Sequence, residues 1–99
     1  MIRGTTPKLE FTLPFDVFQL AEAYVTLSQC SDVVLEKCLA ECEAAGSTLS
    51  VRLTQEETLR LSAEKETEIQ IRVRMHSGDV LASNIIRTNT DRILKDGVI

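Results

Sequence analysis

The stretch Glu68-Ile-Gln-Ile-Arg-Val-Arg-Met75 alternates without interruption between apolar and polar residues. Successive side chains of a β-strand leave the backbone on opposite sides, so a strand with one buried face carries this pattern. The apolar face consists of Ile69, Ile71, Val73 and Met75. The polar face consists of Gln70, Arg72 and Arg74. The stretch therefore predicts a half-buried strand of an antiparallel sheet.

A turn and a return strand follow directly. The segment His76-Ser-Gly-Asp79 contains Gly78, which can supply the positive φ of a tight hairpin turn. The next segment, Val80-Leu-Ala-Ser-Asn-Ile-Ile-Arg-Thr88, has the composition of a strand. Continued alternation places three of its residues on the buried side: Val80, Ala82 and Ile86. We therefore expect an antiparallel hairpin over these residues.

Further alternating segments lie on the N-terminal side of this hairpin: Lys8–Pro14, Ala21–Gln29, Val33–Leu39 and Thr48–Thr54. A tight turn at Ser31-Asp32 would join two of them in a second hairpin. Thr54-Gln-Glu-Glu57 has the pattern of a capping box and predicts one helical turn over Gln55–Leu59 that crosses between the sheets. About six or seven short strands without intervening helices are typical of an antiparallel β-sandwich.

The sequence does not decide the secondary structure of one region. Ala40 to Gly46 contains good helix formers but is too short to nucleate a helix unaided. A strand continuation or a loop is the favoured interpretation, and a helical turn is the alternative.

The predicted core collects the apolar positions of the strands. It consists of Leu9, Phe11, Leu13, Val25, Leu27, Leu49, Val51, Leu53, Ile69, Ile71, Val73, Ala82 and Ile86. Outside the strands, Leu59 and Leu61 are expected to face this core. Phe15 to Gln19 is expected to be a turn segment, with Phe15 and Phe18 tucked under it as a plug.

Length and composition restrict the possibilities further. The chain of 99 residues forms a single predicted domain, residues 1–99, with a short N-terminal arm over residues 1–7. A net charge of −4 and a pI near 4.9 disfavour nucleic acid as a partner, because phosphate binding needs a basic face. No apolar run approaches the length of about 20 residues that a membrane helix needs. The N-terminus lacks a secretory signal, so we expect a cytoplasmic protein.

Few residues suggest chemistry. Cys30, Cys38, Cys42 and His76 could form a Cys3His zinc site, which would make the chain a metal-binding or small-molecule-binding regulator. Cysteines in strands are, however, more often small buried apolar residues. The neighbours of His76 are ordinary turn formers rather than parts of a catalytic triad. We therefore expect neither an enzyme nor a cofactor, and keep the regulator as the alternative function.

Two surfaces are candidates for protein–protein contacts. The first combines arginines and exposed aliphatic residues on the outer face of the terminal hairpin: Arg72, Arg74, Leu81 and Ile85. Their alternative role is an ordinary solvated face on which arginine stems cover the aliphatic residues. The second is the C-terminal segment 92–99, which contains Ile93, Leu94, Val98 and Ile99. We expect this segment to pair along a sheet edge, in this chain or in a second copy, or to dock on a partner.

Several short phrases together resemble a known group of proteins. They are Arg3-Gly-Thr-Thr-Pro7, Phe11-Thr-Leu-Pro14, Glu22-Ala-Tyr-Val-Thr26, Leu53-Thr-Gln-Glu-Glu-Thr58, Glu68-Ile-Gln-Ile-Arg-Val73 and Leu81-Ala-Ser-Asn84. Together they resemble small uncharacterised proteins encoded in the tail regions of phages and prophages of Gram-positive bacteria. The order of elements is also similar to the N-terminal immunoglobulin-like domain of siphophage baseplate upper proteins.

This resemblance implies an immunoglobulin-like β-sandwich that acts as a structural or adaptor module, without a cofactor. It further implies other protein subunits as partners, among them phage tail proteins or further copies of the chain. The location it implies is the cytoplasm of the host cell or the virion tail.

Overall fold

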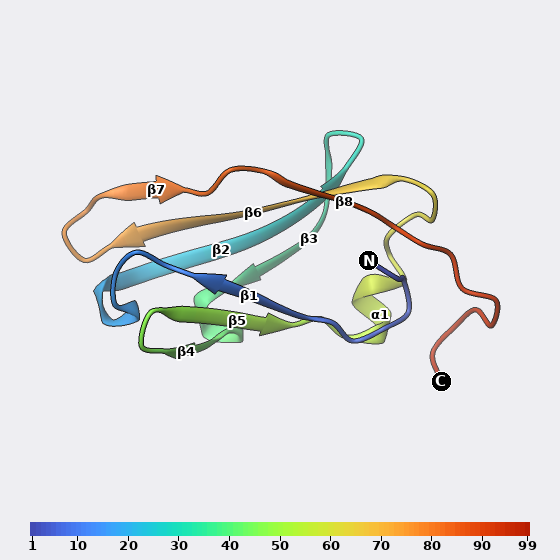
Figure 1. Ribbon diagram of the computed structural model, residues 1–99, viewed down its shortest axis with the longest axis horizontal. Coiled ribbons are helices and arrows are strands. Elements are labelled where there is room, and N and C mark those ends of the chain that lie inside the picture. The colour runs from blue at the N-terminus through green and yellow to red at the C-terminus, as the bar shows by residue number, and fades with distance from the viewer.

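The alternating segments form strands in the structure, a computed structural model that describes residues 1–99 (Figure 1). The elements in chain order are β1 (Lys8–Thr12), the 3-10 turn η1 (Val17–Gln19), β2 (Leu20–Gln29), β3 (Asp32–Cys38), the 3-10 turn η2 (Leu39–Glu41), β4 (Glu43–Ala45), β5 (Thr48–Arg52), α1 (Gln55–Thr58), β6 (Glu66–Met75), β7 (Val80–Ala82) and β8 (Ile86–Asn89). Neither the helix nor the two 3-10 turns is long and apolar enough to cross a membrane.

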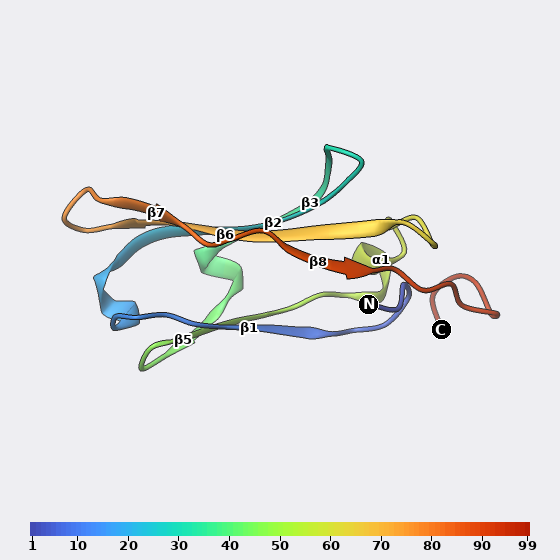
Figure 2. The same ribbon diagram turned by 45° about the horizontal axis from the view of Figure 1, so that its top comes forward.

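The strands are arranged in two antiparallel sheets that face each other in a sandwich-like pair of layers (Figure 2). The smaller sheet has the order β1-β5-β4. The larger sheet has the order β3-β2-β6-β7, and β8 also pairs with β6. The prediction of a mostly antiparallel all-β domain is therefore confirmed. Because the sheets contain three and five strands, the smaller sheet cannot cover the whole inner face of the larger one.

The structure has eight strands rather than six or seven, for two reasons. The undecided region from residue 40 to residue 46 contains both the end of η2 and the short strand β4. In addition, the predicted return strand is divided into β7 and β8. The predicted helical turn is present as α1. Its capping box is formed because the Thr54 hydroxyl accepts from the Glu57 N–H (3.1 Å) and the Glu57 carboxylate accepts from the Thr54 N–H (2.9 Å).

The core contains most of the predicted residues. The buried ones are Val25, Leu27, Leu49, Val51, Leu53, Ile69, Ile71 and Val73. Half-buried residues packed against them include Leu9, Phe11, Leu13 and Phe15. Leu61 is also buried, and Leu59 is half-buried. The prediction for Phe18 is wrong, because its side chain is 86% exposed and Val17 occupies the buried position of that turn.

The prediction that Val80, Ala82 and Ile86 are buried is also wrong, since all three are exposed. Two features explain these positions. The first is the register of the hairpin, which pairs Val80 with Arg74 and Ala82 with Arg72, both on the outer face of β6. The second is a one-residue offset further along the return strand. Arg72 of β6 faces Ala82, whereas Ile69 faces Ile86, so three steps along β6 correspond to four along the return strand. An extra residue of this kind exchanges the two faces of a strand. The hairpin register therefore places Val80 and Ala82 on the outer face. The offset places Ile86, rather than Ile85, on the inner face, where the smaller sheet does not cover it.

The two termini meet at the same end of the molecule (Figure 1). Ile2 forms a parallel β-bridge with Asp91, and the Asp91 N–H donates to the Met1 carbonyl (2.7 Å). The predicted edge strand over residues 92–99 is not formed within this chain, which has no strand after β8. Polar side chains hold this segment instead: Arg3 pairs with Asp96 (2.9 Å) and Gln55 bonds the backbone of Ile99. Docking of the segment on a partner stays a prediction.

Candidate protein-binding groove

An apolar groove opens between the two sheets on the side of β1. We call it the β1 groove, and its volume is about 530 Å³. Its apolar lining consists of Phe11, Leu13, Pro14, Phe15, Ile71, Val73, Leu81, Ala82 and Ile86. One wall is β1 and the segment after it, and the other is β6 with β7 and the start of β8. Figure 2 looks toward this side, with β1 in the lower layer and β7 and β8 in the upper layer.

The β1 wall is fixed by the turn that follows the strand. Pro14 ends β1, since it has no N–H to donate to a ladder. The carboxylate of Asp16 then accepts a backbone N–H of η1 (2.9 Å), which caps that turn. The Val17 N–H donates to the carbonyl of Gly46 (2.9 Å) and its side chain enters the core. Phe15 is thereby held half-buried beside the groove.

The opposite wall is fixed by Ser83, at the offset between β7 and β8. The Ser83 hydroxyl accepts the N–H of Ile71 (3.1 Å), and the Ser83 N–H donates to the Ile71 carbonyl (2.9 Å). The side chain of Ser83 therefore supplies an acceptor to the β6 ladder where the return strand is irregular. Leu81 and Ile86, on either side of the offset, both face inward and remain 47% and 50% exposed. They are the exposed large aliphatic side chains of the groove.

A free strand edge runs beside these apolar residues. The Pro7 carbonyl and the Leu13 N–H both bond to the segment that contains β5. Since backbone groups alternate in direction along an antiparallel strand, those of Lys8, Glu10 and Thr12 point away from β5. β1 has no neighbour on that side. These three residues therefore offer three N–H and three C=O groups without a strand partner.

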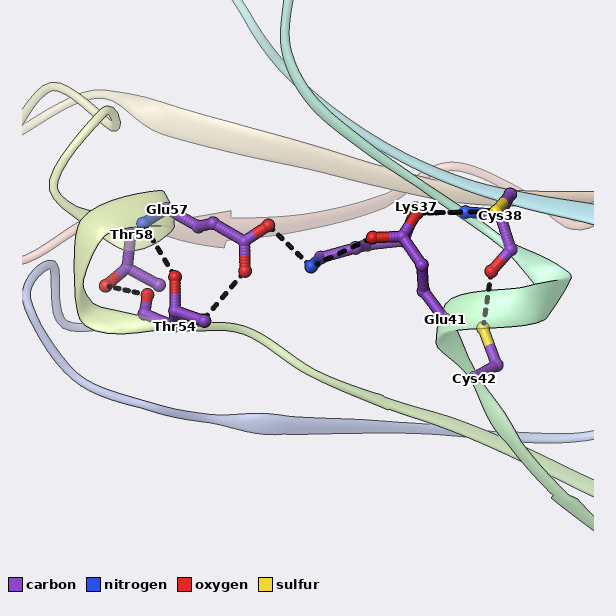
Figure 3. Close-up of polar contacts among 7 residues, drawn as sticks. All are labelled: Lys37, Cys38, Glu41, Cys42, Thr54, Glu57 and Thr58. Carbon is purple, nitrogen blue, oxygen red and sulfur yellow. Dashed lines mark hydrogen bonds and ion pairs between the residues drawn. The ribbon is translucent and has the colours of Figure 1, made fainter.

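At β3, on the other side of the molecule from the β1 groove, an ion pair connects the two layers (Figure 3). Lys37 lies on the inner face of β3, and its Nζ is 2.5 Å from the Glu57 carboxylate and 3.4 Å from that of Glu41. Burial alone would lower the pKa of Lys37, but the hydrogen bonds and charges of Glu57 and Glu41 outweigh it and raise that pKa. Burial alone would raise the pKa of Glu57, but Lys37 and the Thr54 N–H lower it. Both groups therefore stay charged at neutral pH and join the two layers.

The residues of the zinc hypothesis are not brought together. The His76 N–H bonds the Gln19 carbonyl before β2, whereas Cys30 follows the last residue of that ten-residue strand. No three His, Cys, Asp or Glu side chains are gathered where they could hold a metal ion. Only Cys38 and Cys42 are close, and the Cys42 thiol donates to the Cys38 carbonyl (3.3 Å, Figure 3). Burial, with the nearby charges of Cys38 and Glu41, raises the pKa of Cys42.

The predicted outer-face set is divided between two faces. Arg72 and Arg74 point outward, and Ile85 lies in a hollow with Ser28 and Gln70 on the same outer face. The position predicted for Leu81 is wrong, because it pairs with Val73 on the inner face and lines the β1 groove. The reason is the hairpin register, in which Val80 pairs with Arg74 and Leu81 with Val73.

The C-terminal set also differs from the expected edge strand. Ile93 is half-buried against Gly4, whereas Leu94, Val98 and Ile99 are exposed.

Sequence reasoning missed the β1 groove and the Lys37 pair. One signal for Lys37 was present, since Leu35 and Lys37 have the same phase in an alternating strand. A lysine at a core position needs a buried partner. The groove had no comparable signal, because it depends on the unequal widths of the two sheets.

Comparisons with protein-family models, with curated proteins and with solved structures found no match to this chain.

Proposed function

We propose that this chain is a non-enzymatic structural or adaptor protein that binds other protein subunits through the β1 groove. The occupant of the groove is an extended segment of such a subunit, added as a strand beside β1. The observation that carries the proposal is the presence, in one place, of uncovered apolar side chains and a free strand edge. Strand addition at a sheet edge uses both features: main-chain hydrogen bonds give affinity, and side-chain pockets give specificity.

The geometry of the groove provides both the main-chain hydrogen bonds and the side-chain pockets. A strand beside β1 becomes the fourth strand of the smaller sheet and lies beneath the uncovered inner face of β7 and β8. Its inward side chains then contact Leu81 and Ile86, which are half exposed in the free chain. Full burial of a large aliphatic side chain contributes about 1.5–3 kcal/mol. The partner segment therefore needs alternating apolar residues and no proline at its hydrogen-bonding positions.

The biological setting belongs to the same proposal. The chain is a component of a phage or prophage tail or baseplate, with an immunoglobulin-like topology, in the host cytoplasm or the virion. The short sequence phrases support this setting, and the two antiparallel sheets are compatible with such a topology. Proteins encoded beside this chain are the first partners to test by co-purification, and tail proteins are the expected result.

A peptide selection tests the binding mode without knowledge of the partner. Short random peptides are selected for binding to the full chain, and their affinities are measured by fluorescence anisotropy. We expect the enriched peptides to alternate between apolar and polar residues. Leu81→Asp should weaken their binding at least about tenfold, since it places a charge in the apolar groove. The matched control is Leu94→Asp, at a residue that is 92% exposed and outside the groove.

A second variant isolates the free edge. Glu10→Pro removes an N–H that points away from β5, so it leaves the β1–β5 ladder intact but removes a donor for an added strand. We expect this variant to fold, as judged by circular dichroism, and to lose peptide binding. Equal peptide binding by the wild type, Leu81→Asp and Glu10→Pro would contradict the proposal. Enriched peptides without alternating apolar and polar residues would also contradict it.

A further inference from the structure

The outer face of the larger sheet carries an ordered charge pattern that the β1 groove does not use. The outward row of β6 reads Glu66, Glu68, Gln70, Arg72 and Arg74, because the residues between them are buried. One end of the row is therefore acidic and the other basic, with a neutral residue at its centre. Reversing the direction of the strand exchanges the signs of the charges. The pattern is complementary to itself in antiparallel orientation.

The basic end lacks internal ion pairs. Neither Arg72 nor Arg74 forms a salt bridge within the chain. Glu22 is the cross-strand neighbour of Arg74, but its carboxylate accepts the N–H groups of Ala23 (2.9 Å) and Leu39 (3.2 Å). At the other end Arg87 lies 3.5 Å from Glu66 and 3.6 Å from Glu68, so one positive charge accompanies two negative ones.

Apolar side chains accompany both ends of the row. A hollow of about 300 Å³ lies at the basic end, with Tyr24 and Val80 in its lining. A second hollow of about 220 Å³ lies toward the acidic end and includes Val33 and Ile85. Each of these four side chains is more than two-fifths exposed. A solvated face needs no such residues, whereas an interface needs apolar area to supply affinity.

We propose that this outer face binds a second copy of the chain, related by a two-fold axis that lies between the faces and crosses β6 at Gln70. β6 is a central strand with neighbours on both sides, so a partner can reach this row only by face-to-face packing. Two stacked sheets lie about 10 Å apart with strands within about 30° of each other, a distance that opposed Arg and Glu side chains span. The axis places Arg72 and Arg74 of one copy against Glu68 and Glu66 of the other. It also places the Tyr24–Val80 hollow against the Val33–Ile85 hollow.

The two kinds of contact have different roles. Exposed ion pairs add little affinity, but they select the orientation, because a parallel arrangement would oppose like charges. The apolar hollows supply the affinity. A closed two-fold dimer of this kind uses the same patch on both copies and leaves the β1 groove free. The inference therefore goes beyond the proposed function, and either can fail without the other.

A charge exchange tests the inference. In a dimer of the variant Arg72→Glu/Arg74→Glu, each end of the row brings two acidic side chains of one copy against two acidic side chains of the other. In a dimer of the variant Glu66→Lys/Glu68→Lys, the facing side chains are all basic. We expect sedimentation equilibrium to find a wild-type dimer that weakens as salt is added, and a dissociation constant at least about tenfold higher for each variant alone. An equimolar mixture of the two variants should form a heterodimer. Position 72 of each copy then faces position 68 of the other, and position 74 faces position 66, with opposite charges in all four pairs.

The matched control is Arg60→Glu/Arg92→Glu, which changes the net charge equally at exposed positions outside the row. Circular dichroism and the melting temperature report whether each variant folds. A wild-type chain that stays monomeric up to about 1 mM would overturn the inference. So would a dimer that both charge variants retain, or variants that lose the dimer and do not recover it on mixing.

Discussion

Lys37 of β3 and Glu57 of α1 form an ion pair of 2.5 Å between the edge of the larger sheet and the segment that leaves the smaller one. Only 10% and 13% of the two side chains are exposed. Removal of one partner of such a pair leaves the other charge in a poorly solvated position, which is destabilising. The pair therefore has consequences for stability that an exposed ion pair does not have.

Replacement of Glu57 by glutamine should destabilise the chain by about 2 kcal/mol, less than for a fully isolated buried charge because Glu41 remains near Lys37. Glutamine can still take part in the capping box, so the change removes mainly the charge. Urea denaturation followed by circular dichroism measures the effect. The control is Glu56→Gln, an exposed neighbour on α1 without an ion pair. Equal stability of the two variants would show that the pair contributes nothing.

The same pair predicts a specific loss of stability in acid. The pKa of Glu57 is lowered in the folded chain, so its contribution is complete above the ordinary value of 4.5 and is lost as the pH falls through the folded pKa. The pKa of Lys37 is raised, so its contribution is lost only as the pH rises above 10.5. Denaturation curves over a pH series should show the wild type losing stability below pH 4.5 faster than Glu57→Gln. Parallel curves for the two proteins would contradict the assignment.

Gln29→Ala should cost about 2–3 kcal/mol, because it leaves several polar groups without partners. The Gln29 amide donates to the Ser62 carbonyl (3.0 Å) and the Thr67 hydroxyl (3.1 Å), and accepts the Ser62 N–H (2.8 Å). The control is Gln70→Ala, which removes one hydrogen bond from the outer face. Thermal denaturation compares the two, and similar melting temperatures would mean that water replaces the lost contacts of Gln29.

The three thiols should react with iodoacetamide in a defined order. Cys30 is exposed in the turn between β2 and β3 and should react first. Cys42 should react last, since burial and neighbouring charges raise its pKa and reduce the thiolate fraction at neutral pH. Peptide mass spectrometry over a time course reads out each site, and the denatured chain provides the reference rates. Faster labelling of Cys42 than of Cys30 in the folded chain would contradict the structure of this region.

Two truncations separate the parts of the C-terminal segment. A chain that ends at Ile93 should lose at most about 0.5 kcal/mol, because only exposed side chains are removed. A chain that ends at Asp91 should lose about 1–2 kcal/mol more, since Ile93 packs against Gly4. Urea denaturation measures both. Strong destabilisation of the chain that ends at Ile93 would contradict this expectation. It would show that the apolar residues beyond Ile93 are paired or packed, as the edge-pairing prediction requires.

Most of the architecture could be predicted from local pattern. β6 follows from its alternation, and α1 follows from the capping box at Thr54. These elements are predictable because the relevant physics acts between residues close in sequence. The exposed position of Phe18 was not predictable, since both Val17 and Phe18 are apolar and only the geometry of η1 selects between them.

The return strand illustrates what alternation cannot supply. A single extra residue near Ser83 changes which side chains face the core, and no glycine or proline marks the position. The candidate site depends on the same feature. The offset turns Ile86 toward the groove, the hairpin register does the same for Leu81, and the unequal sheets leave both uncovered. These causes lie in the pairing between strands rather than in the pattern of one strand.

The offset at Ser83 also bears on solubility. It divides the outer edge of the larger sheet into β7 and β8, of three and four residues, with an irregular junction between them. Short, interrupted edges are poor templates for unwanted pairing between chains, which is a common origin of aggregation. Deletion of one residue at the junction would join them into one long regular edge. The wild-type chain is thus left with β1, five residues without a bulge, as its accessible edge on the groove side.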